Sequence, residues 1–396
     1  MAHARVLADR PFEQGSRDLT EQILARILPT WSSLGRTDFG APADPVGALR
    51  HPQHGPIATL RVQAQVISAR AKAAASGIAA PHAPSFPAYL ASLLAHFLSP
   101  DGDPGLARVV LANGRVFDAG RCLDDHAWML RALADSYVAT QSRDIRLVAD
   151  LILEFLDSHL ASESIGYFED NQGGGGHRQA SHAHLLDAVL TLHGATGSSV
   201  YLARAASLFE LFRYHLLERD SLNIGETFDR NWRAAPTSGE PTYRTASIAQ
   251  WVVLLQRYHR AANDDQALDL MRMLGLRMLA QRNEHGMLVN AVGASGVVRD
   301  ASMNMRDQLL LCEALRTLAA SDGRRGSELQ RLEAHITRLF IDPAPKGCWC
   351  ESVEANGESR GEPISIETLS MLFDHVARAR TAQTAVERPT RVMHAA

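Results

Sequence analysis

Cysteine is scarce in this chain, which has four cysteines among its 396 residues, at Cys122, Cys312, Cys348 and Cys350. So few and so scattered thiols argue against a disulfide-rich scaffold. Cys348-x-Cys350 also lacks the second thiol pair that a structural zinc site needs. We therefore expect reduced thiols, no metal and a cytoplasmic location.

Long apolar runs and blocks of like charge are missing as well. No apolar run reaches the roughly 18 residues that span a bilayer, and Arg5, Asp9 and Arg10 interrupt any signal-peptide core. Lysine and arginine number 40 against 44 acidic residues, a formal charge of −4 without a basic stripe. We expect no membrane and no nucleic-acid partner.

Helical patterns fill most of the chain. Hydrophobic residues make up 46% of it, and Ala and Leu dominate, which favours packed helices. The apolar periodicity predicts twelve helices, at about 19–34, 57–75, 84–98, 121–140, 144–160, 178–194, 199–218, 245–262, 265–282, 302–320, 326–340 and 366–380. We expect one domain over 1–396, with poorly ordered tails at 1–16 and 381–396.

The links between these helices alternate in character. Asn113-Gly114 between two apolar runs predicts a hairpin, and glycine-fronted, strand-like links recur at 166–169, 225–229, 286–289 and 347–351. The links at the other end, such as 194–197, are short. Six helix pairs with decorated loops at one end predict an all-α (α/α)6 barrel with its pocket at that end. An open solenoid of helix pairs is the alternative.

One segment concentrates polar side chains at a loop-to-helix junction. It runs from Arg178 to Ala188, after the four glycines Gly173 to Gly176. His182 and His184 are two residues apart, so on a helix they point about 200° apart. We predict that His184 and Asp187 face a pocket and that His182 is structural. Polar capping of a helix start is the alternative.

Several segments, in order along the chain, resemble the N-acylglucosamine 2-epimerase superfamily. His182-Ala-His184-Leu-Leu-Asp187-Ala188 is similar to its segment Asn-x-His-x-His-Leu-Leu-Glu-Ala. Other similar segments are Leu60-Arg-Val-Gln-Ala-Gln65, Leu123-Asp-Asp-His126-Ala-Trp128, Gly225-Glu226-Thr-Phe-Asp-Arg-Asn-Trp232, Ala246-Ser-Ile-Ala-Gln-Trp251, Cys312-Glu313-Ala-Leu, Gly347-Cys-Trp349 and Asp374-His375-Val-Ala-Arg378. This resemblance implies the (α/α)6 barrel and a sugar epimerase or isomerase.

The departures from the family pattern bear on catalysis. Members use an Arg on the second helix, His on the eighth and twelfth helices, and Glu residues near both. The resemblance places Gln65 at the Arg position, Ser247 at the first His and Gln250 at the nearby Glu, and Leu309 where a Trp is expected. His375 and Glu313 match.

Epimerisation at C2 of a sugar begins with removal of a proton next to the open-chain carbonyl, a task suited to histidine. We predict His375, Glu313 and His184 as catalytic residues. The predicted substrate-binding residues are Glu226, Trp232, Asp187, Gln65, Ser247, Gln250, His126 and Arg178. Helix-interior packing for His375 and an ion pair for Glu313 are the structural alternatives. For Asp124, helix capping is the favoured interpretation. Trp128, Trp251 and Trp349 are predicted in the core.

Two functions of different kinds follow. The first is a cofactor-independent epimerase or isomerase acting at C2 of a mono- or short oligosaccharide through an enediolate. The second is a catalytically impaired member that binds a sugar or a partner, because three site positions lose charge. A two-carboxylate glycosidase is a weaker third. The expected partner is a small carbohydrate, and a homodimer is left open.

Overall fold

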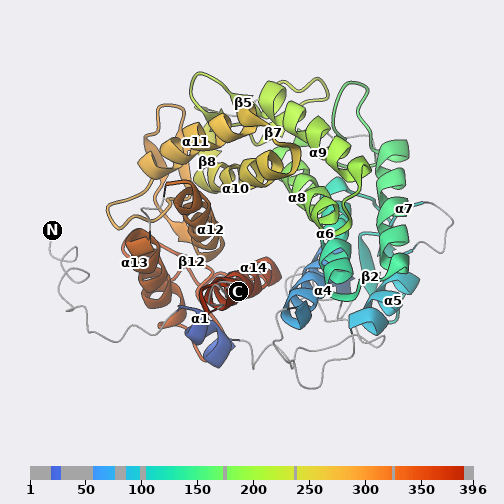
Figure 1. Ribbon diagram of the computed structural model, residues 1–396, viewed down its shortest axis with the longest axis horizontal. Coiled ribbons are helices and arrows are strands. Elements are labelled where there is room, and N and C mark those ends of the chain that lie inside the picture. Colours follow the sequence, from blue (N-terminus) through green and yellow to red (C-terminus); the bar gives the residue numbers. More distant parts are fainter. Residues whose placement is uncertain are drawn as a thin grey trace, which may run out of the picture.

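Helices arranged as two concentric rings form the body of the protein (Figure 1). The computed structural model describes residues 19–27, 57–75, 86–98, 104–172, 176–235, 239–322 and 326–387. The inner ring consists of α4 (Leu60–Ala75), α6 (Leu123–Thr140), α8 (Gln179–Thr196), α10 (Thr245–Ala262), α12 (Met305–Asp322) and α14 (Ile366–Glu387). The outer ring consists of α5 (Phe86–Phe97), α7 (Arg143–His159), α9 (Ser199–Leu211), α11 (Asp265–Ala280), α13 (Gly326–Ile336) and the short α1 (Leu19–Gln22).

The inner ring is closed. Each inner helix packs against the next in chain order, and α14 packs against α4, so that the last inner helix meets the first. Short π-helical turns continue α1, α9 and α13, over Ile23–Ile27, Phe212–Leu216 and Thr337–Ile341. The predicted (α/α)6 barrel is confirmed, and the open solenoid is wrong.

The two rings follow from two kinds of helix sequence. Outer helix α7 buries one stripe, formed by Ile145, Ala149, Ile152 and Leu156, and exposes its other face to solvent. The inner helices lie between the outer ring and the barrel axis, so α6 and α8 bury residues on several sides. None of the helices that the structure describes is long and apolar enough to cross a membrane.

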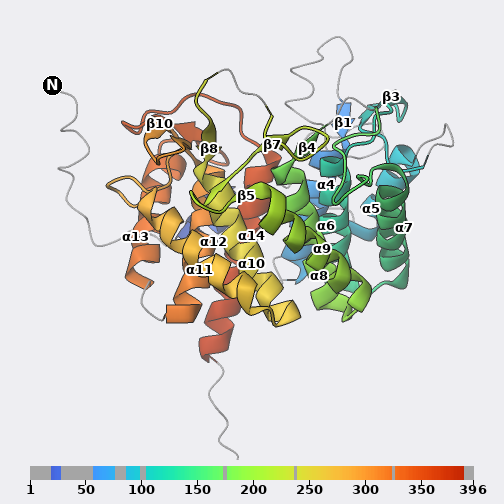
Figure 2. The same cartoon turned by 90° about the horizontal axis from the view of Figure 1, so that it is seen from above.

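Short strands lie together at one end of the barrel (Figure 2). They form five small antiparallel sheets: β1 (Ile57–Thr59), β2 (Val109–Leu111) and β3 (Val116–Asp118); β4 (His177–Arg178) and β7 (Thr227–Phe228); β5 (Leu217–Glu218) and β6 (Asn223–Ile224); β8 (Thr242–Arg244), β9 (Ala291–Gly293) and β10 (Val298–Asp300); β11 (Met303–Asn304) and β12 (Ser352–Val353). Because β1, β4, β8 and β11 lead directly into α4, α8, α10 and α12, these inner helices begin at the strand end.

Most predicted boundaries hold, and four differ. The hairpin at Asn113-Gly114 is confirmed, with Gly114 at φ +83° donating to the carbonyl of Leu111. Residues 57–59 form strand β1 rather than the start of a helix, because they pair with β2. The segments 199–218 and 326–340 end in π-helical turns, and α14 continues to Glu387, into the predicted tail. Residues 1–16, 28–34, 173–175 and 388–396 lie outside the described residues.

Candidate active site

A cavity of about 350 Å³ lies inside the inner ring, and all six inner helices contribute to its wall. Most of the lining side chains are charged or polar. They are Arg61, Lys72, Asp124, Trp128, Arg131, Arg178, Gln179, Ser181, His184, Asp187, Glu226, Arg244, Ser247, Gln250, Arg306, Glu313, Glu367, Ser370, Asp374 and Arg378, together with a few apolar residues. A closed ring of helices therefore surrounds a polar pocket, as the sequence predicts.

Alternating charges connect the starts of neighbouring inner helices. Arg61 of α4 contacts Asp124 of α6 at 2.9 Å and Glu367 of α14 at 2.5 Å. The same Glu367 accepts from Arg306 of α12 at 2.9 Å. Burial acts to raise the pKa of Glu367, but Arg306 and Arg61 outweigh it and lower that pKa to about 2. This carboxylate is therefore ionised at neutral pH.

The chain of charges continues at both ends. Asp307, beside Arg306, contacts Arg244 at 3.4 Å, and Arg244 precedes α10. At the other end Asp124 contacts His184 of α8 at 2.7 Å. We call these residues (Arg244, Asp307, Arg306, Glu367, Arg61, Asp124 and His184) the upper belt. The belt passes through all six inner helices or their first residues and leaves one gap, between α8 and α10.

A second set of ion pairs crosses the barrel farther along the inner helices. Lys72 contacts Asp374 at 2.7 Å and Asp135 at 3.4 Å, and Arg378 contacts Glu313 at 2.6 Å. Arg131 joins Asp135 to Asp187, which also binds Arg257. We call these residues (Lys72, Asp374, Asp135, Arg131, Asp187, Arg257, Glu313 and Arg378) the lower belt.

The lower belt bears on two predicted site residues. Glu313 and Asp187 both line the cavity, and each carboxylate is compensated by arginine. The predicted inward pair of His184 and Asp187 is present in the cavity wall, but the two side chains bind different partners. The contact of Glu313 with Arg378 matches the ion-pair alternative for this residue.

His184 is the histidine that lines the cavity. Its Nδ1 contacts Asp124 Oδ1 at 2.7 Å, and its ring lies 4.8 Å from the Trp128 ring. A carboxylate can only accept a hydrogen bond here, so Nδ1 carries a hydrogen, and in the neutral imidazole the lone pair is on Nε2. Burial acts to raise the pKa of Asp124, while His184 and Arg61 outweigh it and lower that pKa. The pair is thus an imidazole oriented by an ionised carboxylate.

Glu226 is a second candidate for proton transfer. It lies in the link between β6 and β7 and lines the cavity, and its Oε1 accepts from Ser247 Oγ at 2.7 Å. Burial raises the pKa of Glu226, against the opposing effects of Ser247 and Arg244. Gln250 and Arg178 also line the cavity. Five predicted substrate-binding residues, Glu226, Asp187, Ser247, Gln250 and Arg178, therefore share one pocket.

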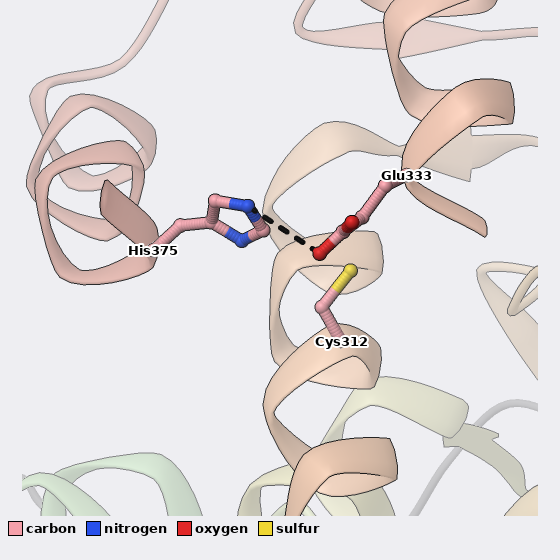
Figure 3. Close-up of side chains that lie close together, drawn as sticks. All are labelled: Cys312, Glu333 and His375. Atoms are coloured by element: carbon pink, nitrogen blue, oxygen red, sulfur yellow. Dashed lines mark ion pairs between the residues drawn. The ribbon is translucent and has the colours of Figure 1, made fainter. Parts of the chain in front are cut away.

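His375 lies outside the cavity lining. Its ring is 3% exposed and lies between helices, 3.6 Å from Glu333 of outer helix α13, with Cys312 of α12 beside it (Figure 3). Burial lowers its pKa to about 3, and Arg316 and Arg378 add to that effect. Its surroundings do not fit the predicted role of a base acting on a substrate in this cavity, and they match the packing alternative.

The donor atoms of Cys312, Glu333 and His375 lie within 4.8 Å of one another, which is close enough for a shared metal ion. However, Arg316 donates to Glu333 at 2.7 Å and contacts His375 Nδ1 at 3.2 Å. The guanidinium already compensates the carboxylate. Arg316 therefore links Glu333 and His375 in a hydrogen-bonded network, with Cys312 beside them.

Three further predicted residues do not line the cavity. His126 is buried, accepts from the Leu106 amide at 3.0 Å, and stacks on Phe155. Trp232 stacks on His177 at 3.8 Å. Gln65 is buried in α4 and lies outside the lining. Their placement fits packing roles rather than substrate binding.

Some cavity residues were missed by the sequence analysis. Arg61 lies one turn before Gln65 and supplies the charge expected on this helix. Trp128 lines the cavity although it was predicted in the core, while Trp251 and Trp349 are buried as predicted. Asp124 was read as a cap, but it reaches across to α8. The sequence feature that could have identified these residues is a charged side chain within a largely apolar inner helix, as at Arg61 and Arg306.

Comparison with solved structures finds the same barrel in sugar-converting enzymes. Cellobiose 2-epimerase from Bacillus thermoamylovorans has a TM-score of 0.76 at 15% identity, over 90% of this chain and 97% of that one. Cellobiose 2-epimerase from Spirochaeta thermophila has a TM-score of 0.71 at 18% identity, over 92% and 96%. A D-mannose isomerase has a TM-score of 0.72 at 15% identity, over 92% and 96%. At these identities the likeness concerns the fold.

A search among curated proteins found no match. The model of the N-acylglucosamine 2-epimerase (GlcNAc 2-epimerase) family matches residues 87–367, which is more than half of the chain. The matched region covers four of the six inner helices, α6, α8, α10 and α12, and most of the cavity lining. The chain therefore belongs to the N-acylglucosamine 2-epimerase family.

Proposed function

We propose that this protein is a sugar 2-epimerase or aldose–ketose isomerase in which His184 is the base. The observation that carries this proposal is the His184–Asp124 pair in a polar cavity of about 350 Å³. That volume is at the lower end of small-molecule sites and suits a mono- or short oligosaccharide. Family membership and the activities named for its structural neighbours support the reaction class.

In the proposed reaction, His184 Nε2 takes the proton from C2 of an open-chain aldose. The electrons of the broken C–H bond form the C1–C2 double bond of an enediolate, and negative charge develops on the former carbonyl oxygen. Arg61, which lies over the Trp128 ring at 5.9 Å, is the proposed donor to this oxygen. Asp124 stabilises the imidazolium that forms on His184.

The product depends on where the proton returns. Return to C2 on the opposite face gives the epimer and needs a second acid, for which we propose Glu226. Its buried carboxyl holds a proton more readily than an exposed one. Return to C1 from His184, with transfer of the C2 hydroxyl proton to the C1 oxygen, gives the ketose. These steps use acid, base and donor groups that the chain supplies, so the proposed reaction runs without a cofactor.

The test is deuterium incorporation at C2 of mannose, N-acetylmannosamine and cellobiose in deuterated water, followed by NMR. We expect incorporation by the wild type and a loss of about a hundredfold or more in the His184→Gln variant. The matched control is His285→Gln, because His285 is a partly exposed histidine outside the cavity lining.

Equal incorporation by the His184→Gln variant would rule out His184 as the base. Binding of a sugar without incorporation by the wild type would instead favour the catalytically impaired alternative. Thermal melting of each variant separates loss of chemistry from loss of fold.

A further inference from the structure

The start of α8 forms part of the cavity wall at the gap in the upper belt. Gln179, Ala180 and Ser181 line the cavity, and the N-cap residue Arg178 makes no side-chain capping hydrogen bond. The Gln179 amide donates to the Glu226 carbonyl. The first amides of an 18-residue helix carry its positive dipole end, which favours an anion.

A buried donor on this wall lacks an acceptor. The Gln179 side chain is 1% exposed, and its Nε2 has no hydrogen-bond partner among the described residues. Leaving a buried amide donor unpaired costs free energy. Because Gln179 lines the cavity, a ligand with acceptor oxygens would satisfy this donor.

Arg178 differs from the other cations of the cavity. It is exposed at the cavity wall, and it is the one lining cation without an ion pair to any part of the chain that the structure describes. Arg61, Arg131, Arg306 and Arg378 each have a carboxylate within 3.2 Å. Across the gap, Arg244 forms an ion pair with Asp307, at 3.4 Å, and Asp307 is shared with Arg306.

Three carboxyl groups, those of Asp124, Glu169 and Glu226, lie near the start of α8. None of them forms an ion pair with Arg178 among the described residues. Asp124 is engaged by His184 and Arg61. Glu169 binds Ser181 Oγ at 2.6 Å, and burial raises its pKa to about 7. Burial also raises the pKa of Glu226. Burial therefore favours the neutral form of both glutamates, which weakens the negative charge beside Arg178.

We propose that the gap between α8 and α10 is a subsite for an anionic group, phosphate or carboxylate, on the sugar substrate. Arg178 and the Nε2 of the Gln179 side chain donate to this group at the positive end of α8, and Arg244 faces it from the start of α10. The proposal rests on the cavity being a sugar site, as proposed above. It names the substrate class as an acidic sugar, because a neutral hydroxyl would use the Gln179 donor but not the uncompensated charge of Arg178.

Calorimetric titration tests the subsite without requiring turnover. The probes are mannose, mannose 6-phosphate, mannuronate and inorganic phosphate, with wild type and Arg178→Gln. A charge-assisted hydrogen bond strengthens binding on the order of tenfold to a hundredfold. We expect the wild type to bind at least one charged sugar more tightly than mannose by this factor. We expect the Arg178→Gln variant to lose this difference in affinity. The matched control is Arg272→Gln, because Arg272 is a surface arginine outside the cavity lining.

Each outcome separates the two proposals. Equal or tighter binding of mannose by the wild type would overturn the subsite, as would an equal loss of all sugars in Arg178→Gln. Binding of inorganic phosphate as tight as that of the charged sugars would show an anion site without a sugar role, which also overturns it. Charge-dependent binding without deuterium incorporation would leave the subsite standing and remove the proposed reaction. Deuterium incorporation into neutral sugars, without tighter binding of charged sugars, would leave the proposed reaction standing and remove the subsite.

Discussion

Two histidines that are neighbours in sequence occupy different chemical environments. His182 is buried, accepts from the Tyr167 amide at 3.0 Å and contacts the Arg178 carbonyl at 2.7 Å. Burial lowers its pKa to about 4. His184 points to the cavity and contacts Asp124. Because successive helical residues are about 100° apart, a spacing of two gives one structural and one cavity-facing histidine.

Asp124 gives a prediction that concerns the tautomer of His184. In Asp124→Asn the amide can donate to Nδ1, which moves the imidazole hydrogen to Nε2 and blocks the proposed base. We expect deuterium exchange to slow by about a hundredfold with KM little changed. Steady-state kinetics of deuterium exchange measure both quantities.

The control for this change is Asp269→Asn, because Asp269 is exposed on the outer ring, outside the cavity lining. A variant of Asp124 that keeps the wild-type rate would mean that the carboxylate serves only the ion pair with Arg61. A loss of rate with an unchanged melting temperature would support the tautomer argument.

At the scale of elements, periodicity predicted each inner helix but not the rotation of each helix about its axis. Asp374 and His375 are adjacent, so only one of them faces the cavity, and it is Asp374. On α4 the cavity residues are Arg61 and Lys72, while Gln65, one turn after Arg61, lies outside the lining. Either side chain would satisfy the helical pattern. The choice depends on partners distant in sequence, such as Glu367 for Arg61 and Glu333 for His375, which periodicity cannot identify.

The loop before α8 illustrates how one element is held in place. Gly166 has φ +75°, and a Cβ built there would lie 2.9 Å from Leu211 Cδ2, 2.9 Å from Trp232 Cζ2 and 3.0 Å from His182 Nε2. Replacement by alanine adds backbone strain and crowding against three side chains that support α8. We expect Gly166→Ala to destabilise the fold by about 3 kcal/mol, measured by urea unfolding.

Gly197 provides the comparison, because it has a similar φ of +68° and nothing within 4 Å of an added Cβ. Gly197→Ala isolates the backbone strain, which costs about 1 kcal/mol. If both variants lose the same stability, crowding at Gly166 has no effect and the neighbouring side chains have moved aside.

For the whole molecule, the belts join elements that the chain brings together last. Arg61 of the first inner helix contacts Glu367 of the last, so an ion pair lies across the seam where the barrel closes. Hydrophobic patterning predicted six pairs of helices, and the large core cluster, which extends from Leu19 to Val376, fits that division. The belts could not be predicted, because their partners come from different helices and depend on closure.

Glu367→Gln tests the contribution of the seam to stability. The folded-state pKa of Glu367 is lowered to about 2, so its stabilisation is present above the unfolded pKa and is lost as pH falls through about 2. The variant should therefore unfold more easily than wild type by about 3 kcal/mol at pH 7, and by only about 1 kcal/mol near pH 2.5. Urea denaturation at several pH values measures the difference. The control Glu284→Gln, at a carboxylate that is 88% exposed, should change little at any pH. A Glu367→Gln penalty that stays constant with pH would mean that the seam depends on the shape of this side chain and not on its charge.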